Sequence, residues 1–294
     1  MALYFSDDQL LNDEGGETQP SAPVSPQPAK HSESITPKAS APVFPDDHVV
    51  KEQLGILRTG DRDARQNATR QLHDYAKKHR DNYPSHIIPS LVEGLSDSAW
   101  MVRWVVTEVL VMLNAREAKP HLLPLLADAH PPLRMTVVHA IALLGDGSDV
   151  VHLTPLLTEK QTSMREAVIQ ALGTLGSPMA IHALLPYLRD SERSIRLYTI
   201  EALGRIGDKS VVDVLHTYLK IGDESVRWVC IEALGRLADP RSVQDLRLCL
   251  DDMRHPMWDD KRVCDMAVDA LTTIGTLEAI QLVEEWRNKQ IPSS

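Results

Sequence analysis

Residues 194–208 read SIRLYTIEALGRIGD, and residues 225–239, which begin 31 positions later, read SVRWVCIEALGRLAD. Both stretches carry an arginine in third place and the block IEALGR. An arginine followed by an apolar run recurs at the same interval through the middle of the chain, at Arg103, Arg134, Arg165, Arg196 and Arg227. Weaker copies centre on Arg65 and Cys264. A period of this length is typical of proteins built from stacked structural units.

Each unit contains two segments with the apolar spacing of helices and no strand-like alternation. The first is leucine-rich, as in HLLPLLAD at 121–128, and the second carries the arginine. Glycines that follow the second segment, Gly145, Gly176 and Gly207, are predicted to be left-handed helix caps, with Pro178 and Pro240 as stop and restart signals. Neither segment can bury its apolar face alone, but stacked pairs can. The sequence therefore predicts an all-α protein, a right-handed α-solenoid of about seven helix pairs over residues 46–290.

The acid–arginine spacing together with EALGRIGD resembles the short HEAT-like repeat named after phycobilisome lyases. The resemblance covers about 240 residues. It implies a ladder in which an acid near the start of each second helix pairs with arginines of its own and neighbouring repeats. Arginine suits this role because its planar fork bonds carboxylates and loop carbonyls together. The ladder residues are Asp97, Arg103, Asp128, Arg134, Glu159, Arg165, Asp190, Arg196, Asp223 and Arg227. An anion clamp is the functional alternative.

Other repeated positions are assigned to architecture. Pro124, Pro155 and Pro186 lie inside the first helices and are expected to bend them. The apolar positions Val138, Ile169, Ile200 and Ile231 are expected to be core.

The positions one and five after each arginine share a helix face and are expected to point outward. The resemblance places second helices on the concave side of the solenoid. In chain order this stripe is Trp104 and Glu108, Met135 and His139, Glu166 and Gln170, Leu197 and Glu201, Trp228 and Glu232, and Asp265 and Asp269, extended by Arg205 and Arg236. Exposed tryptophan among acids is typical of binding surfaces. The alternative is that Trp104 and Trp228 pack laterally between repeats.

Enzyme chemistry has little support in the sequence. Deoxyhypusine hydroxylase, a HEAT-repeat iron enzyme, binds metal through His-Glu dipeptides, and this chain has none. His121 and His152 are one repeat apart, about 10 Å, which is too far for joint ligation of one ion. We therefore expect no metal, no cofactor and no catalytic residue. The resemblance leaves one enzymatic alternative, a bilin lyase subunit or phycobilisome-handling factor, in which the stripe would hold a tetrapyrrole.

The first 45 residues differ from the rest in composition. Seven prolines lie among Ser, Ala and Gln, which predicts a disordered acidic tail. The segment MALYFSDDQLL at 1–11 has Ser6 and Gln9 in the places of a helix cap. Its apolar residues Leu3, Tyr4, Phe5 and Leu10 predict a docking motif for another protein. The alternative is that this segment folds back on its own domain.

The last repeat contains an insertion, DDMRHPMWDDKR at 251–262. Met253, Met257 and Trp258 give it an apolar tip, and we interpret it as a terminal cap, with a partner contact as the alternative.

Charge and cysteine content narrow the class of protein further. The net charge of −10 disfavours nucleic acid, and no apolar run is long enough for a membrane span. Cys230, Cys249 and Cys264 all lie in periodic apolar segments, which is typical of core cysteines in a reducing compartment. The sequence as a whole predicts a cytoplasmic, non-enzymatic scaffold that binds a protein or peptide on its concave face.

Overall fold

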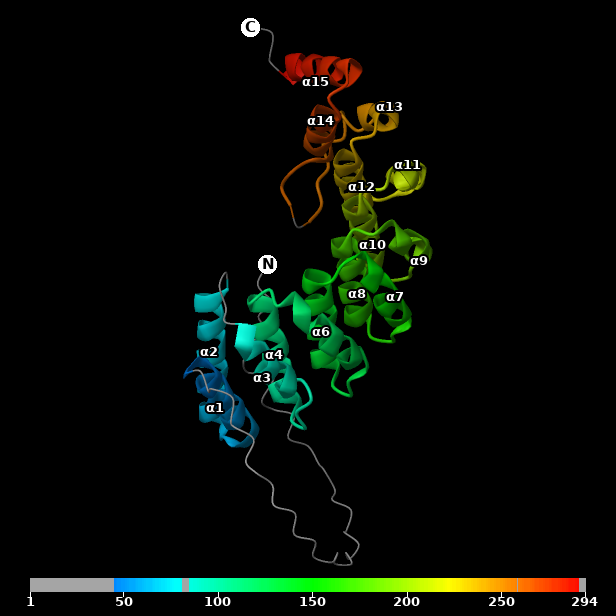
Figure 1. The fold of residues 1–294 in the computed structure, drawn as a ribbon. Helices are drawn as coiled ribbons and strands as arrows, with labels where there is room; N and C mark the ends of the chain where they lie inside the picture. The colour runs from blue at the N-terminus through cyan, green and yellow to red at the C-terminus, as the bar shows by residue number, and fades with distance from the viewer. Residues whose placement is uncertain (1–44, 81–84, 258, 291–294) are drawn as a thin grey trace, which may run out of the picture.

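The computed structural model describes residues 45–80, 85–257 and 259–290, and within these ranges every regular element is helical (Figure 1). The predicted tail up to Phe44 and the docking motif at Leu3, Tyr4, Phe5 and Leu10 lie outside the described residues. The fold is an all-α solenoid of seven helix pairs followed by one last helix, α15 (Leu277–Gln290), in the part of the chain that the structure describes.

The second helices of the pairs form the concave, inner layer of a crescent, and the first helices form the convex, outer layer (Figure 1). The inner helices are α2 (Arg62–His79), α4 (Trp100–Met112), α6 (Pro131–Leu144), α8 (Thr162–Leu175), α10 (Arg193–Ile206), α12 (Glu224–Leu237) and α14 (Val263–Ile274). The outer helices are α1 (Pro45–Thr59), α3 (Ile88–Gly94), α5 (Lys119–Leu122), α7 (Val150–Leu153), α9 (Ile181–Leu184), α11 (Val212–Ile221) and α13 (Val243–Arg247).

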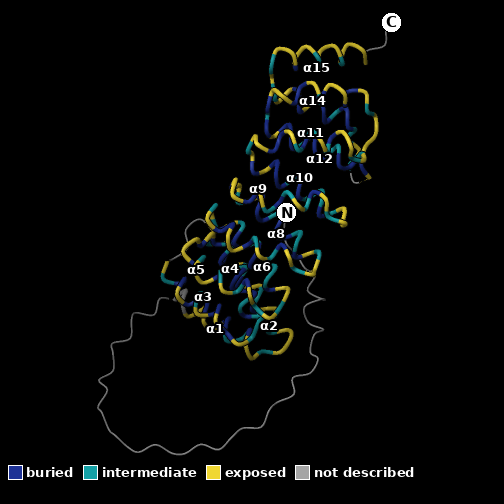
Figure 2. The backbone as a smooth tube through the Cα atoms, turned by 90° about the vertical axis from the view of Figure 1, so that its right-hand side faces the viewer, coloured by how far each residue is buried: buried dark blue, intermediate teal, exposed yellow. Residues whose placement is uncertain are grey.

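The core is one continuous layer between the inner and outer helices (Figure 2). The predicted core positions Val138, Ile169, Ile200 and Ile231 are all buried in it. The three cysteines are buried and free, as the apolar periodicity predicts.

Three outer helices change to a 3₁₀ helix where the repeated proline stands. The 3₁₀ segments are η3 (Leu123–Ala127), η5 (Thr154–Thr158) and η7 (Leu185–Arg189), and each has its proline in the first turn. Proline lacks an N–H and clashes with the preceding turn, so the α-helical bonding pattern ends there.

Glycine and alanine bring neighbouring inner helices close together. A Cβ placed on Gly173, Gly204 or Gly235 would lie about 3 Å from the alanine of the next inner helix, and for Gly204 it would be 2.7 Å from the Ala233 Cβ. The Ala-x-Gly of the repeated EALGR block is therefore a helix-contact motif, a role that the sequence analysis did not assign. Close inner helices beside kinked outer ones curve the stack.

The predicted glycine caps are confirmed at two of three sites. Gly176 and Gly207 have φ values of 64° and 77°. Gly145 is different and the prediction there is wrong: it is extended, because the Asp149 carboxylate of the next capping box accepts a hydrogen bond from the following N–H, that of Asp146. At the end of α12, the sixth inner helix, Ala238 occupies the cap position with a φ of 46°.

The end of the solenoid is covered by α15. Its Ala279 and Val283 are buried, and the Trp286 indole donates to the Leu250 carbonyl at 2.7 Å. The interpretation of the 251–262 insertion as the terminal cap is therefore wrong. That loop instead projects from the start of α14 on the concave side (Figure 1).

Candidate functional site

The repeated arginines bind neighbouring units together at the start of the inner helices. The Arg103 guanidinium donates to the Asp128 carboxylate of the next unit at 2.9 Å and to the main-chain carbonyl of Asp97, in its own unit, at 2.6 Å. Arg134, Arg165 and Arg196 make the same carbonyl bond in their own units. The main-chain carbonyl of each acid thus accepts a hydrogen bond from the arginine of its own repeat. Its carboxylate remains available to accept from the arginine of the preceding repeat.

The carboxylate half of the ladder varies along the chain. Asp97 accepts from Arg58, which the sequence analysis did not single out, at 2.7 Å. The Arg134–Glu159 pair is long, at 3.9 Å, and among the described residues Arg196 has no carboxylate partner in the next unit. Asp190 and Asp223 serve as local caps, accepting from the N–H groups of Glu192 and Ser225.

The ladder resumes at the last unit, where Arg227 pairs with Asp252 at 3.1 Å. Asp252 also accepts from Arg254, which is the main reason why the pKa of its carboxyl lies below the ordinary value. At Asp128, burial alone would raise the pKa. Hydrogen bonds from the His130 main chain and ring, with the charge of Arg103, lower it overall. The carboxylates of Asp128 and Asp252 both bond an arginine of the preceding repeat and so stabilise the contact between repeats.

The two stripe tryptophans contact the following repeat. Trp104 is only 9% exposed, so the expectation that it faces outward is wrong: its indole donates to the Thr136 hydroxyl on α6 at 3.1 Å. The half-buried Trp228 donates to the Lys261 carbonyl at 3.2 Å. A large flat side chain one position after the arginine reaches across the narrow gap between inner helices. It therefore packs against the next repeat and is not fully exposed to solvent.

Several other stripe residues also lie partly between helices. Met135 and Leu197 are half-buried against the core, and burial lowers the pKa of His139. Glu108 contacts the His73 ring on α2 at 3.1 Å.

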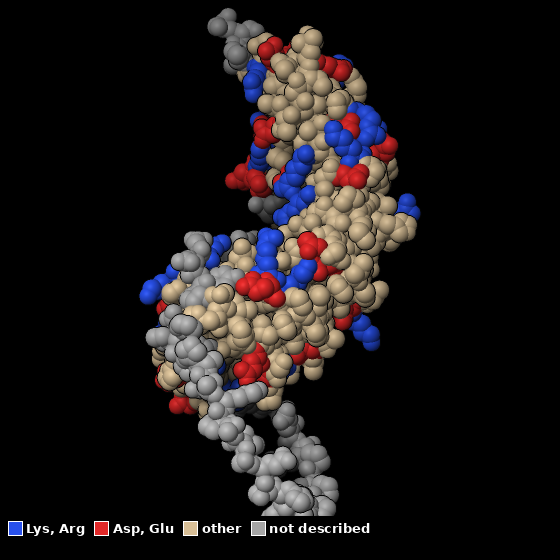
Figure 3. Space-filling view, viewed as in Figure 1, with Lys and Arg blue, Asp and Glu red and all other residues tan. Residues whose placement is uncertain are grey.

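The exposed part of the stripe is charged and lies on the later repeats. Arg205 pairs with Glu201, and Arg236 with Glu232, each at 2.6 Å and one helical turn apart. Side chains of both charges lie together along the concave edge, whereas the surface over α7 and α9 is largely uncharged (Figure 3).

A groove of about 250 Å³ runs between α12 and α14 on this face. Glu232, Arg236 and Asp269 form its polar rim, and Ile231 and Met266 lie beneath. Asp269 pairs with Lys261, so the 251–262 loop ends at the edge of the groove.

The base of that loop is fixed and its tip is exposed. The Val263 N–H donates to the Arg254 carbonyl at 2.8 Å, and the Cys264 N–H to the Asp252 carbonyl at 2.9 Å. At the tip, Met257 is 98% exposed. The loop therefore exposes an apolar side chain at its tip and reaches the charged groove through Lys261 at its end.

One side-chain triad on the outer layer has the order of a hydrolase triad. The His216 ring lies 3.0 Å from the Ser242 hydroxyl and 3.3 Å from the Asp245 carboxylate, which also pairs with Lys220. Ser242 is completely buried, so no substrate can reach it. This network, which sequence spacing gave no reason to expect, joins α11 to α13.

Within the described ranges, no group of three or more His, Cys, Asp or Glu side chains has the geometry of a metal site. Nor does any helix there combine the length and apolar character that a bilayer span requires.

The architecture defines a class of protein, the helix-pair α-solenoid. Models of HEAT repeats match residues 50–142, 88–173, 120–196 and 181–257, and the chain belongs to the HEAT-repeat family. HEAT-repeat solenoids are typical protein-interaction scaffolds. A search of curated proteins found no significant match.

Several solved structures are similar to this chain. The chain is similar to Kap95p in its complex with RanGDP (TM-score 0.58, 14% identity, 84% of this chain and 40% of that one). It is also similar to YibA of Escherichia coli (TM-score 0.51, 15% identity, 88% of this chain and all of that one). A third is the CpcE–CpcF complex of phycocyanin lyase from Nostoc (TM-score 0.46, 18% identity, 88% and all). At these identities the likeness to Kap95p and YibA shows the fold alone.

Proposed function

We propose that this protein is a non-enzymatic scaffold that binds a protein partner through the concave side of its last two repeats. The observation that carries the proposal is the groove between α12 and α14 with the exposed Met257 loop at its edge. The partner segment has an apolar anchor for the groove and the methionine, and a basic residue opposite Glu232 and Asp269.

The chemistry of this surface suits peptide binding. Methionine is flexible and polarizable and adapts to apolar partners of different shape. A charged rim around an apolar centre gives orientation and specificity. The interior of the stripe contributes rigidity, because Trp104 and Trp228 hold neighbouring repeats together.

The test compares partner capture by the full chain and by matched surface variants in extracts of the native host. Met257→Asp with Glu232→Lys changes the proposed site at exposed or rim positions, while Val151→Asp changes an outer-layer residue that is 54% exposed. We expect at least one protein to be retained by the native chain and by Val151→Asp but lost, by about tenfold or more, with the double variant. Equal retention by all three proteins would contradict the proposal.

On the surface of the described residues, no feature favours the alternative, a tetrapyrrole site. The arginines that would bind propionates, Arg205 and Arg236, are each paired with a glutamate on the same helix. A red-shifted absorbance band after mixing with phycocyanobilin would reverse this preference.

A further inference from the structure

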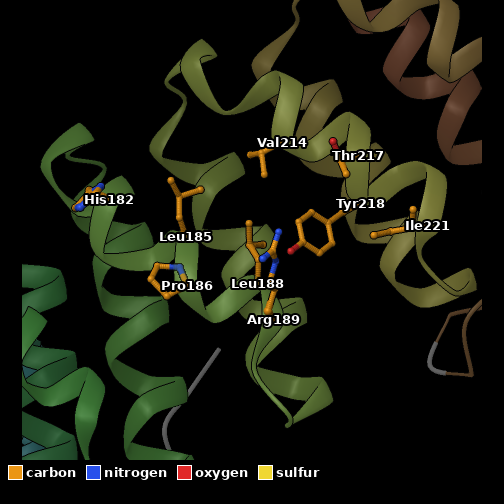
Figure 4. Close-up of a pocket in the computed structure, with 9 residues that line it drawn as sticks. All are labelled: His182, Leu185, Pro186, Leu188, Arg189, Val214, Thr217, Tyr218 and Ile221. Atoms are coloured by element: carbon orange, nitrogen blue, oxygen red, sulfur yellow. The ribbon is translucent and has the colours of Figure 1, made fainter.

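A second, larger groove lies on the outer layer, between α9–η7 and α11 (Figure 4). Its volume is about 500 Å³, within the range of roughly 300–1,000 Å³ that holds compact ligands or a few side chains of a docked segment. The walls are mostly apolar and include Leu185, Pro186, Val214 and Tyr218. Arg189 extends beside the Tyr218 ring (Figure 4).

The groove occurs where the repeat pattern changes. Pro186 kinks the outer segment on one side, but Thr217, one period later, leaves α11 as a continuous helix of 10 residues. A kinked and a straight segment cannot pack along their whole length. The ladder acid is also replaced here: Ile221 stands one period after Asp190 and is 72% exposed. An apolar residue thus lies at the groove edge where earlier units have a carboxylate.

The charge in this groove has one sign. Arg189 is exposed, and within the described ranges it has no ion pair, while no acidic residue lines the groove. The concave groove differs because Glu232 and Asp269 line it and its arginine is already paired. An apolar segment that carries acids is therefore complementary to the outer groove, whereas the bases at the concave groove, Arg236 and Lys261, already have carboxylate partners.

The chain itself contains such a segment outside the described residues. MALYFSDDQLL at 1–11 combines six large apolar side chains with Asp7 and Asp8 and has no lysine or arginine. Ser6 and Gln9 favour a helix that starts at Asp7, which would present Leu10 and Leu11 on one side and the two acids near its N-terminus.

The connecting chain is long enough to reach. Residues 12–44 link the segment to α1 and, as a Pro-rich extended chain at about 3.1 Å per residue, span up to about 100 Å. Five outer-layer steps of about 10 Å separate α1 from α11.

We propose that residues 1–11 dock into the outer groove of the same chain, with Phe5 and Leu10 on its apolar wall and Asp7 and Asp8 facing Arg189. A partner that uses either the segment or the groove must then displace the other. This intramolecular contact is separate from the proposed concave site, and either can fail without the other.

The test is photo-crosslinking in the full chain, with p-benzoylphenylalanine at position 5 and the products mapped by mass spectrometry. We expect cross-links within one chain to residues 181–221. Equal mixtures of light and ¹⁵N-labelled chains distinguish links within a chain from links between chains. Links only to other parts of the chain, or only between chains, would overturn the proposal.

Charge reversal supplies the second arm. Arg189→Glu should reduce the yield of the cross-link by about fivefold, the size expected for loss and reversal of an exposed charge pair. Asp7→Lys with Asp8→Lys in the Arg189→Glu chain should restore it. Arg116→Glu, an exposed change on the outer layer outside the groove, is the matched control and should have no effect. Circular dichroism verifies that each variant is folded, and an unchanged yield with Arg189→Glu would refute the contact.

Discussion

The regular units from α4 to α10 keep the features of the repeat, whereas the units that follow Gly207 depart from them. In the regular part each outer segment is kinked by proline, the acid stands six residues before the arginine, and glycine caps α8 and α10. After Gly207, α11 is straight, the acid moves to Asp223, Ala238 replaces the capping glycine, and a loop is inserted at 251–262.

This difference separates architecture from candidate function. Where the sequence repeats, its arginines bond main-chain carbonyls of their own units, and Arg103 also bonds the Asp128 carboxylate of the next unit. Where the repeat departs from its pattern, both grooves and the exposed Met257 appear. A solenoid is stabilised mainly by contacts between neighbours, so a departure in one unit alters the surface locally and leaves distant units intact.

The largest expected effect comes from removing two ladder arginines of the regular part, one with and one without a carboxylate partner in the next unit. Arg103→Met should lower the free energy of unfolding by about 3 kcal/mol, because the Asp128 carboxylate, nearly buried, loses its charged partner. Arg196→Met should cost about 1 kcal/mol, since Arg196 bonds only carbonyls of its own unit among the described residues. Urea unfolding of the two variants measures the difference.

A second experiment separates the contribution of the Arg103–Asp128 ion pair to stability from that of the Arg103 side chain alone. Asp128→Asn in the Arg103→Met background removes the unpaired charge and should recover part of the lost stability. Equal costs for Arg103→Met and Arg196→Met would show that the carboxylate half of the ladder contributes nothing to the regular part.

The next effect tests the close approach of the inner helices. Gly204→Ala should destabilise the protein by about 2 kcal/mol, because the new Cβ would overlap Ala233 and push α10 and α12 apart. Gly55→Ala on α1 is the matched control, since nothing lies within 4 Å of its Cβ position. It should stabilise the protein by about 0.5–1 kcal/mol through helix propensity. A stabilising Gly204→Ala would contradict the contact-motif assignment.

Sequence reasoning recovered the architecture because the repeat carries it redundantly. Five arginines at one period, helical apolar spacing and the caps at Gly176 and Gly207 all indicate the same helix pairs. It recovered the surface only in part: Glu232, Arg236 and Asp269 of the predicted stripe line the concave groove, but Trp104 is buried. Whether Trp104 is buried depends on the separation of α4 and α6, and that separation is a property of two repeats together.

The outer groove and the hollow shape of the concave one were missed for a related reason. Each arises from a mismatch between adjacent units, at Thr217 against Pro186 and at the insertion before α14, and a mismatch has no signature within a single unit. Comparing copies for the positions that change between them is the signal that finds such sites. It indicates Ile221 as clearly as it indicates Trp228.

The smallest expected effect concerns the helix cap where the regular pattern is lost. Ala238 has φ 46°, a conformation that costs an L-residue about 1–2 kcal/mol, whereas glycine adopts it freely. Replacing Ala238 by glycine would remove this cost, but part of the gain in stability is offset by the greater conformational freedom of glycine in the unfolded chain. Ala238→Gly should therefore stabilise the protein by about 0.5 kcal/mol, and Gly207→Ala, its converse in the regular part, should destabilise it by about the same amount or slightly more. Thermal unfolding of both variants is the measurement. Opposite signs would show that the later units keep the backbone of the repeat while its sequence diverges, and a loss of stability in Ala238→Gly would instead mean that the Ala238 methyl group has acquired a packing role of its own.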